Sequence, residues 1–111
     1  MVTVARMNPV VATSHCVFKK SFWGQATTLE ALRQVYQAVF AQGYMKILSF
    51  AFADNAQLKG LARRLGAKIE GRLRRQTLRG GKAADMIAIG LLKENFDRAV
   101  EALCAMEAKA A

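Results

Sequence analysis

The chain has 111 residues and a formal net charge of +9, and 53% of its residues are hydrophobic. These values are typical of one globular domain over residues 1–111 and exclude a disordered chain. The apolar runs are too short to span a bilayer, and residues 1–9 lack the pattern of a signal peptide, so we expect a cytoplasmic protein. Cys16 and Cys104 lack metal-ligand spacing, which predicts reduced, buried thiols and no metal site.

The first half of the chain predicts strand, helix and strand. Residues 2–5 are short and apolar and are followed by Asn8-Pro9, so they predict at best a short edge strand. Residues 10–18 are rich in β-branched residues and predict a strand. A helix is expected over about residues 28–42, ending at Gly43, and its apolar stripe is Leu29, Leu32, Tyr36, Val39 and Phe40. Residues 44–52 read as a buried strand, which predicts a parallel βαβ unit.

The second half predicts a helix, two strands and a last helix. The helix covers about residues 56–65 and ends at Gly66. Apolar or small residues alternate with charged residues over 67–74, and residues 85–92 are nearly all apolar. Because Gly80-Gly81 marks a loop between these two segments, they predict an antiparallel hairpin with a longish loop. Asn95 is the expected cap of the last helix, whose buried stripe is Phe96, Ala99, Val100, Leu103 and Met106. The expected order is β-α-β-α-β-β-α, an α/β chain with a mixed sheet.

The turn before the first helix has the features of an anion site. The first N–H groups of a helix have no intrahelical partners, and the helix dipole favours negative charge there. Gly24 and Ala26 allow a ligand to approach the backbone, and Thr27 and Glu30 have the spacing of a capping box. An ordinary strand-to-helix turn explains the same residues.

Positive charge is concentrated in the middle of the chain, with one acid, Glu70, among the cations. This clustering predicts an acidic partner, such as nucleic acid, a phosphorylated cofactor or an assembly neighbour, and a solvated basic face is the alternative. The cations are Lys59, Arg63, Arg64, Lys68, Arg72, Arg74, Arg75, Arg79 and Lys82.

Residues 15–96 contain a series of landmarks in a characteristic order and spacing. They are Trp23-Gly24-Gln25-Ala26 with Glu30-Ala31-Leu32, Phe40 and Gly43, Asn55 with Leu65-Gly66, Glu70-Gly71 with Arg72 and Arg74, Gly81, Asp85, and Leu91 to Phe96. In this order and spacing the chain resembles the C-terminal half of the GNAT acetyltransferases, most nearly the branch that includes the ribosomal-protein N-terminal acetyltransferases.

The resemblance implies a truncated GNAT-like fold and a cleft for acetyl-CoA. In that family the strands corresponding to residues 10–18 and 46–52 splay apart around the pantetheine arm. Asn55 matches a family asparagine near the pantetheine, although a plain helix cap is the alternative. Lys59 or Arg63 is a candidate for the cofactor's 3′-phosphate. The implied pyrophosphate donors are the N–H groups of Trp23, Gly24, Gln25, Ala26 and Thr27, with the hydroxyl of Thr27 or Thr28.

The sequence departs from the family at three places. Ser21 and Ala26 stand where the loop usually has Gln or Arg and Gly. Ala62 stands where many members carry the tyrosine that reprotonates the CoA thiolate, and Leu58 stands where the related branch has a serine. The family's first strand and acceptor-side helices have no counterpart before Val2.

Candidates for proton transfer in place of that tyrosine are His15, Cys16 and Tyr44. Strand alternation places His15 and Cys16 on opposite faces, so one of them at most looks into a cleft. His15 has the unperturbed pKa of a base, and a structural role is its alternative.

The resemblance and the departures from it imply two alternative functions. The first is acetyl transfer from acetyl-CoA to an amine. The second is an inactive GNAT-fold subunit of a larger assembly, such as a phage particle, which contacts its partners through the basic strip or associates as an oligomer. Nucleic-acid binding is less favoured, because the strip lacks interleaved aromatic residues and a helix-turn-helix pattern.

Overall fold

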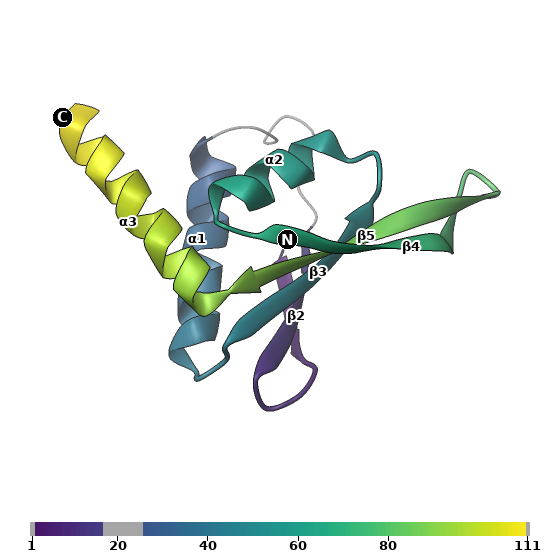
Figure 1. The fold of residues 1–111 in the computed structure, drawn as a ribbon, viewed down its shortest axis with the longest axis horizontal. Coiled ribbons are helices and arrows are strands. Elements are labelled where there is room, and N and C mark those ends of the chain that lie inside the picture. The colour runs from purple at the N-terminus through teal and green to yellow at the C-terminus, as the bar shows by residue number, and fades with distance from the viewer. Residues whose placement is uncertain (1, 17–25, 111) are drawn as a thin grey trace.

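The computed structural model describes residues 2–16 and 26–110, which form one mixed sheet and three helices (Figure 1). The strands are β1 (Val2–Arg6), β2 (Val11–Cys16), β3 (Lys46–Phe52), β4 (Lys68–Arg79) and β5 (Lys82–Leu92). The helices are α1 (Ala26–Ala41), α2 (Ala56–Arg64) and α3 (Lys93–Ala110). None of the described helices combines the length and the apolar character needed to cross a membrane.

The spatial order of the strands is β1-β2-β3-β5-β4. The β2–β3 pair is parallel and the β4–β5 pair is antiparallel, so both predicted pairings are confirmed. The expected order β-α-β-α-β-β-α omits β1. Residues 2–6 do form a strand at the sheet edge, where they pair antiparallel with β2.

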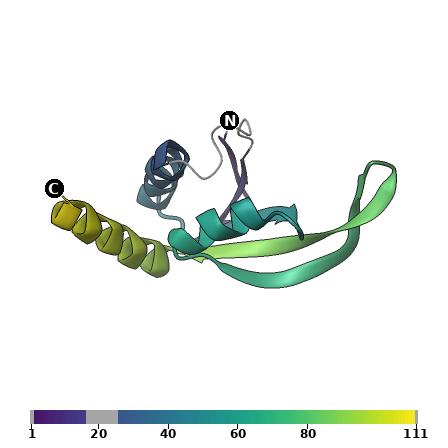
Figure 2. The ribbon, with the colours of Figure 1, turned by 90° about the horizontal axis from the view of Figure 1, so that it is seen from above.

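One face of the sheet carries the core. Register places Ala12 beside Ile47, and Ile47 beside Leu91, in one buried row. Leucines of α1 and α2 join the same cluster, so both helices cover this face. Seen from above, they lie on one side of the sheet (Figure 2). On the opposite face Phe50 remains 38% exposed, because no described element packs over it.

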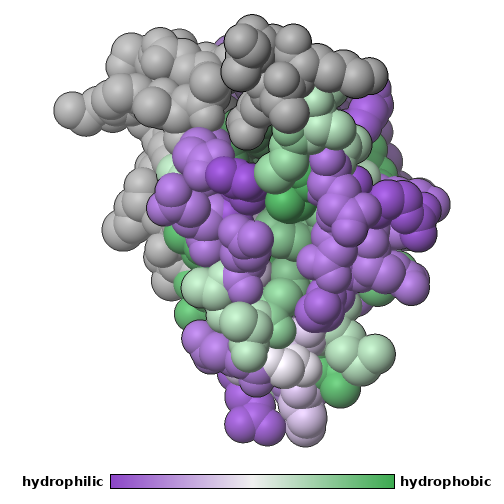
Figure 3. Space-filling view, turned by 90° about the vertical axis from the view of Figure 1, so that its left-hand side faces the viewer, coloured by the Kyte–Doolittle hydropathy of each residue, from purple (hydrophilic) through white to green (hydrophobic). Residues whose placement is uncertain are grey.

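Helix α3 begins at Lys93, so the prediction of Asn95 as its cap is wrong. Phe96 is 1% exposed and holds the start of α3 against α1, with its ring centroid 5.2 Å from that of Phe40. The helix then extends away from the sheet (Figures 1 and 2). Met106 is therefore 66% exposed, and its predicted place in the buried stripe is wrong. The space-filling view of this side shows a band of apolar side chains between hydrophilic areas (Figure 3).

The β4–β5 hairpin is longer than predicted, and its connection is shorter. The strands continue to a two-residue turn at Gly80-Gly81, whose φ angles of 59° and 79° are those that two-residue hairpins favour. A register shift between Leu73 and Thr77 contains Arg75, which has a φ of 51°. This bulge interrupts the alternation of side chains, so the sequence pattern of residues 75–79 does not predict the strand that the structure has there.

Candidate functional site

The parallel strands β2 and β3 part from each other near their carboxyl ends. Their pairing runs from Val11 with Lys46 to Ser14 with Ser49 and then stops. Beyond this point β2 pairs with β1 alone, and β3 pairs with β5 alone. The splayed strands that the family resemblance implied are therefore present, with the Ser14–Ser49 pair at their vertex.

A cavity of about 220 Å³ opens beside this vertex. Its walls come from α1, α2, β3 and β5, and most of its lining is apolar. Ala51, Ala62 and Ala67 contribute to the lining, and their short side chains leave room between α2 and the sheet. We refer to this space as the α1–α2 cavity.

Among the described residues, four with polar side chains contribute to the lining of the α1–α2 cavity: His15, Tyr36, Ser49 and Asn55. The Tyr36 hydroxyl lies 3.0 Å from the Ser14 hydroxyl, and both side chains are buried. Asn55 accepts a hydrogen bond from the Leu58 N–H at 3.0 Å and caps α2. Asn55 thus serves as a helix cap and as a wall of the cavity at the same time.

Of the three candidates for proton transfer, His15 and Tyr44 lie in different places, and the side chain of Cys16 lies outside what the structure describes. His15 is exposed and contributes to the lining one residue beyond the vertex, and strand alternation places its side chain on the sheet face opposite to that of the buried Ser14. Tyr44 precedes β3 at the opposite end of that strand, where it packs against the core cluster and is not part of the cavity wall.

The predicted pyrophosphate loop falls mostly on residues that the structure does not describe. Trp23, Gly24 and Gln25 lie outside the described residues, and Ala26 is the first residue of α1. Thr27 is therefore the second residue of α1 and is not the N-cap of that helix. Thr28 is only 2% exposed, so its hydroxyl is not on the protein surface.

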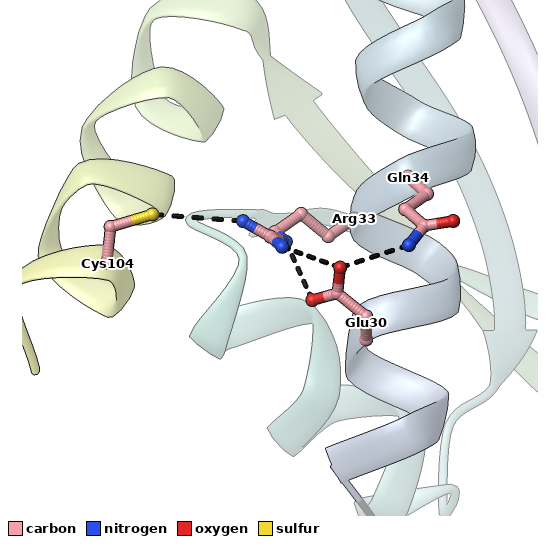
Figure 4. A network of polar contacts seen from close by, with 4 residues as sticks. All are labelled: Glu30, Arg33, Gln34 and Cys104. Atoms are coloured by element: carbon pink, nitrogen blue, oxygen red, sulfur yellow. Dashed lines mark hydrogen bonds and ion pairs between the residues drawn. The ribbon is translucent and has the colours of Figure 1, made fainter. Parts of the chain in front are cut away.

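The predicted capping partner of Thr27 is engaged elsewhere (Figure 4). The Glu30 carboxylate accepts hydrogen bonds from the Arg33 guanidinium at 2.9 and 2.5 Å and from the Gln34 amide at 3.1 Å. The Arg33 hydrogen bonds, followed by that from Gln34, hold the pKa of Glu30 below its ordinary value. Arg33 also lies 3.8 Å from the Cys104 sulfur on α3. Cys104 is exposed, so the prediction of a buried thiol is wrong for this residue.

The predicted basic strip occupies α2 and the β4–β5 hairpin. Arg72 pairs with Asp85 at 2.8 Å, and Arg79 pairs with Asp54 at 2.8 Å while its guanidinium lies 4.6 Å above the Phe52 ring. Within the part of the chain that the structure describes, the other cations of α2 and the hairpin form no ion pair. These are Lys59, Arg63, Arg64, Lys68, Arg74, Arg75 and Lys82.

Sequence reasoning missed the Tyr36–Ser14 pair. The sequence predicts Tyr36 in the buried stripe of α1, and its burial is confirmed. The available signal was a hydroxyl on that stripe together with a serine inside a strand, because two buried hydroxyls need partners. In the described ranges, no group of three metal-ligating side chains comes together.

No protein-family model and no curated protein matches the sequence. Solved structures do match. A probable GNAT-family acetyltransferase from Chromobacterium violaceum aligns with a TM-score of 0.76 at 21% identity, over 86% of this chain and 50% of that chain. A GNAT-family acetyltransferase from Bacillus anthracis aligns with a TM-score of 0.73 at 15% identity, over 84% of this chain and 57% of that chain.

Spermidine N-acetyltransferase from Vibrio cholerae, in complex with CoA and spermine, aligns with a TM-score of 0.77 at 16% identity. The alignment covers 86% of this chain and 58% of that chain. These matches show that the chain has the fold of the GNAT acetyltransferases. The chain spans between 50% and 58% of the length of these three proteins.

Proposed function

We propose that this chain binds acetyl-CoA in the α1–α2 cavity and transfers the acetyl group to an amine. The observation that carries the proposal is the parting of β2 and β3 beside that cavity. Ligands of open α/β sheets bind at the carboxyl ends of strands, where connections diverge. The fold shared with GNAT acetyltransferases, one of them in complex with CoA, supports this ligand.

The described residues fit such a ligand. Beyond the Ser14–Ser49 pair, the facing backbone edges of β2 and β3 no longer pair with each other, so they offer hydrogen bonds to the amides of a pantetheine arm. The apolar lining suits the methylene groups of that arm. The N-terminus of α1 follows β2 in the chain, and its N–H groups and dipole favour a pyrophosphate.

The chemistry requires positioning and proton transfer. Holding the amine and the thioester in contact accounts for much of the rate acceleration. A backbone N–H near the vertex polarises the thioester carbonyl. His15 is exposed to solvent one residue beyond the vertex, so we assign it, with water as the alternative, the removal of a proton from the attacking amine.

A calorimetric titration with acetyl-CoA tests the proposal. The wild-type protein is expected to bind in the micromolar range. Ala62→Phe fills the cavity and is expected to abolish binding, whereas Gln57→Phe places the same ring on an exposed position of α2 and leaves the affinity unchanged. Absence of heat from the wild type at millimolar acetyl-CoA, or equal binding by both variants, would contradict the proposal.

A second candidate function rests on the basic strip. We propose that the unpaired cations of α2 and the hairpin contact an acidic partner, such as a neighbouring subunit of an assembly. This function suits a chain that keeps the fold without catalysis. An assembly partner implies a location in that assembly, a phage particle included, whereas acetyl-CoA chemistry implies the cytoplasm. Nucleic acid remains the less favoured partner, and the first of these two functions is the one developed below.

A further inference from the structure

We infer that Tyr36 is the proton donor to the leaving thiolate of CoA in the α1–α2 cavity. This inference rests on the proposed acetyl transfer. It assigns a role to a buried hydroxyl pair that neither the sequence motifs nor the fold comparison accounts for.

The position of the Tyr36 hydroxyl is the first observation. Tyr36 lines the cavity from α1, and its hydroxyl lies 3.0 Å from that of Ser14. Ser14 is the last residue of β2 that pairs with β3, and its partner Ser49 also lines the cavity. Tyr36 and these two serines therefore come from three elements and meet at the vertex of the splayed strands.

The second observation is the character of the surrounding wall. Ala62 lies on the cavity wall at the position where the GNAT resemblance places a tyrosine, and alanine carries no transferable proton. The described lining is otherwise apolar apart from Ser49, Asn55 and His15. An apolar wall solvates a thiolate poorly, so transfer of a proton to sulfur has a large effect there. His15 is assigned to the amine, which leaves Tyr36 as the acidic hydroxyl for sulfur.

The packing of Tyr36 holds its hydroxyl in place. The ring is buried and meets the ring of Phe96 edge to face, with centroids 6.5 Å apart. The hydrogen bond with Ser14 fixes the far end of the side chain. A proton donor held at both ends needs little reorganisation when charge develops on sulfur.

The step balances as follows. The amine nitrogen bonds to the thioester carbon, the carbon–sulfur bond breaks, and its electron pair goes to sulfur. The amine gives one proton to His15 or water, and the Tyr36 hydroxyl gives its proton to sulfur. CoA leaves as the free thiol, and the phenolate regains a proton from water.

Two variants separate this role from a structural one. Tyr36→Phe keeps the ring and removes the proton, and its kcat is expected to fall by roughly 10²–10⁴-fold. Ser14→Ala removes the same hydrogen bond but keeps the phenol, and its kcat is expected to fall by less than about tenfold. Both variants are expected to bind acetyl-CoA as the wild type does in calorimetry.

The readout is free CoA and acetylated product, separated by chromatography after incubation with acetyl-CoA and a panel of amines that includes spermidine and peptide amines. Equal losses of kcat in both variants would assign the pair a structural role and overturn the inference. Binding of acetyl-CoA without any acetyl transfer by the wild type would also overturn it. Absence of acetyl-CoA binding would instead overturn the proposed function itself.

Discussion

The α1–α2 cavity and the β4–β5 hairpin are built from the same sheet but have opposite chemical character. The cavity is walled by apolar side chains, and its hydroxyl pair is buried. The hairpin reaches away from the helices (Figure 2). Near its turn Leu78 is 71% exposed, and among the described cations of the hairpin Arg74, Arg75 and Lys82 form no ion pair. A small ligand suits the first region, and an acidic surface suits the second. The two candidate functions can therefore be tested independently on one chain.

The largest expected effect concerns the packing behind the cavity. Phe96→Ala removes the ring that joins α3 to Phe40 and Tyr36 of α1, and it should lower the free energy of unfolding by about 3–5 kcal/mol. Met106→Ala, on the exposed part of α3, should change it by less than about 0.5 kcal/mol. Urea unfolding followed by circular dichroism measures both. If Phe96→Ala lowered the free energy of unfolding by less than about 1 kcal/mol, the packing of α3 would not support the cavity.

Glycines of positive φ near the two regions also have different surroundings, and Gly66 lies between the cavity-lining residues Leu65 and Ala67. Gly66 has a φ of 90°, and an added Cβ would lie 2.6 Å from the backbone oxygen of Asn95, so Gly66→Ala should cost about 2–4 kcal/mol. Gly80 has a φ of 59° with nothing within 4 Å, so Gly80→Ala should cost about 1 kcal/mol from backbone strain alone. Thermal unfolding of both variants ranks them. The reverse order would show that the hairpin turn is the more constrained region.

Charge reversal sharpens the comparison of function. Arg74→Glu with Lys82→Glu should weaken binding to poly-glutamate by about tenfold and leave the affinity for acetyl-CoA within about twofold of the wild type. Arg98→Glu on α3, which lies outside the strip, should change neither. Fluorescence anisotropy with labelled poly-glutamate, and with duplex DNA for comparison, measures the effect. Tighter binding to DNA than to poly-glutamate would favour the nucleic-acid alternative.

The smallest expected effect is a pH dependence in the hairpin bulge. The backbone N–H of Arg75, followed by the side chain of Arg72, holds the pKa of Asp85 below its ordinary value of 3.8. Since the folded-state pKa is the lower one, this stabilisation is fully present above pH 3.8 and is lost as the pH falls through the folded-state value. The Arg75 amide should therefore exchange its hydrogen faster at low pH, relative to the intrinsic rate, than near neutrality. In Asp85→Asn the protection should show no such change.

The sequence predicts the secondary structure correctly where the apolar residues of a segment follow one regular spacing. The stripe that contains Leu32 and Phe40 located α1, and the βαβ spacing predicted the parallel β2–β3 pair. The sequence does not predict the structure where a residue breaks the regular alternation of a strand, as Arg75 does in the bulge of β4.

The cavity was beyond local patterns for a different reason. Ala51, Ala62 and Ala67 are ordinary small residues in β3, in α2 and before β4, and only the packing of α2 against the sheet brings them together. The Tyr36–Ser14 contact likewise joins positions 22 residues apart. The family resemblance indicated where the strands part, but it did not indicate which hydroxyl lies at the vertex.

The most direct test of the central claim is to map acetyl-CoA onto the chain by NMR with nitrogen-labelled protein. The account predicts that the backbone signals of residues 14–16, 49–52 and 55–62 shift on addition of acetyl-CoA, whereas those of residues 74–82 stay in place. Shifts confined to residues 74–82 would mean that the ligand's phosphates bind the basic hairpin nonspecifically. That result would contradict the assignment of the α1–α2 cavity as the acetyl-CoA site.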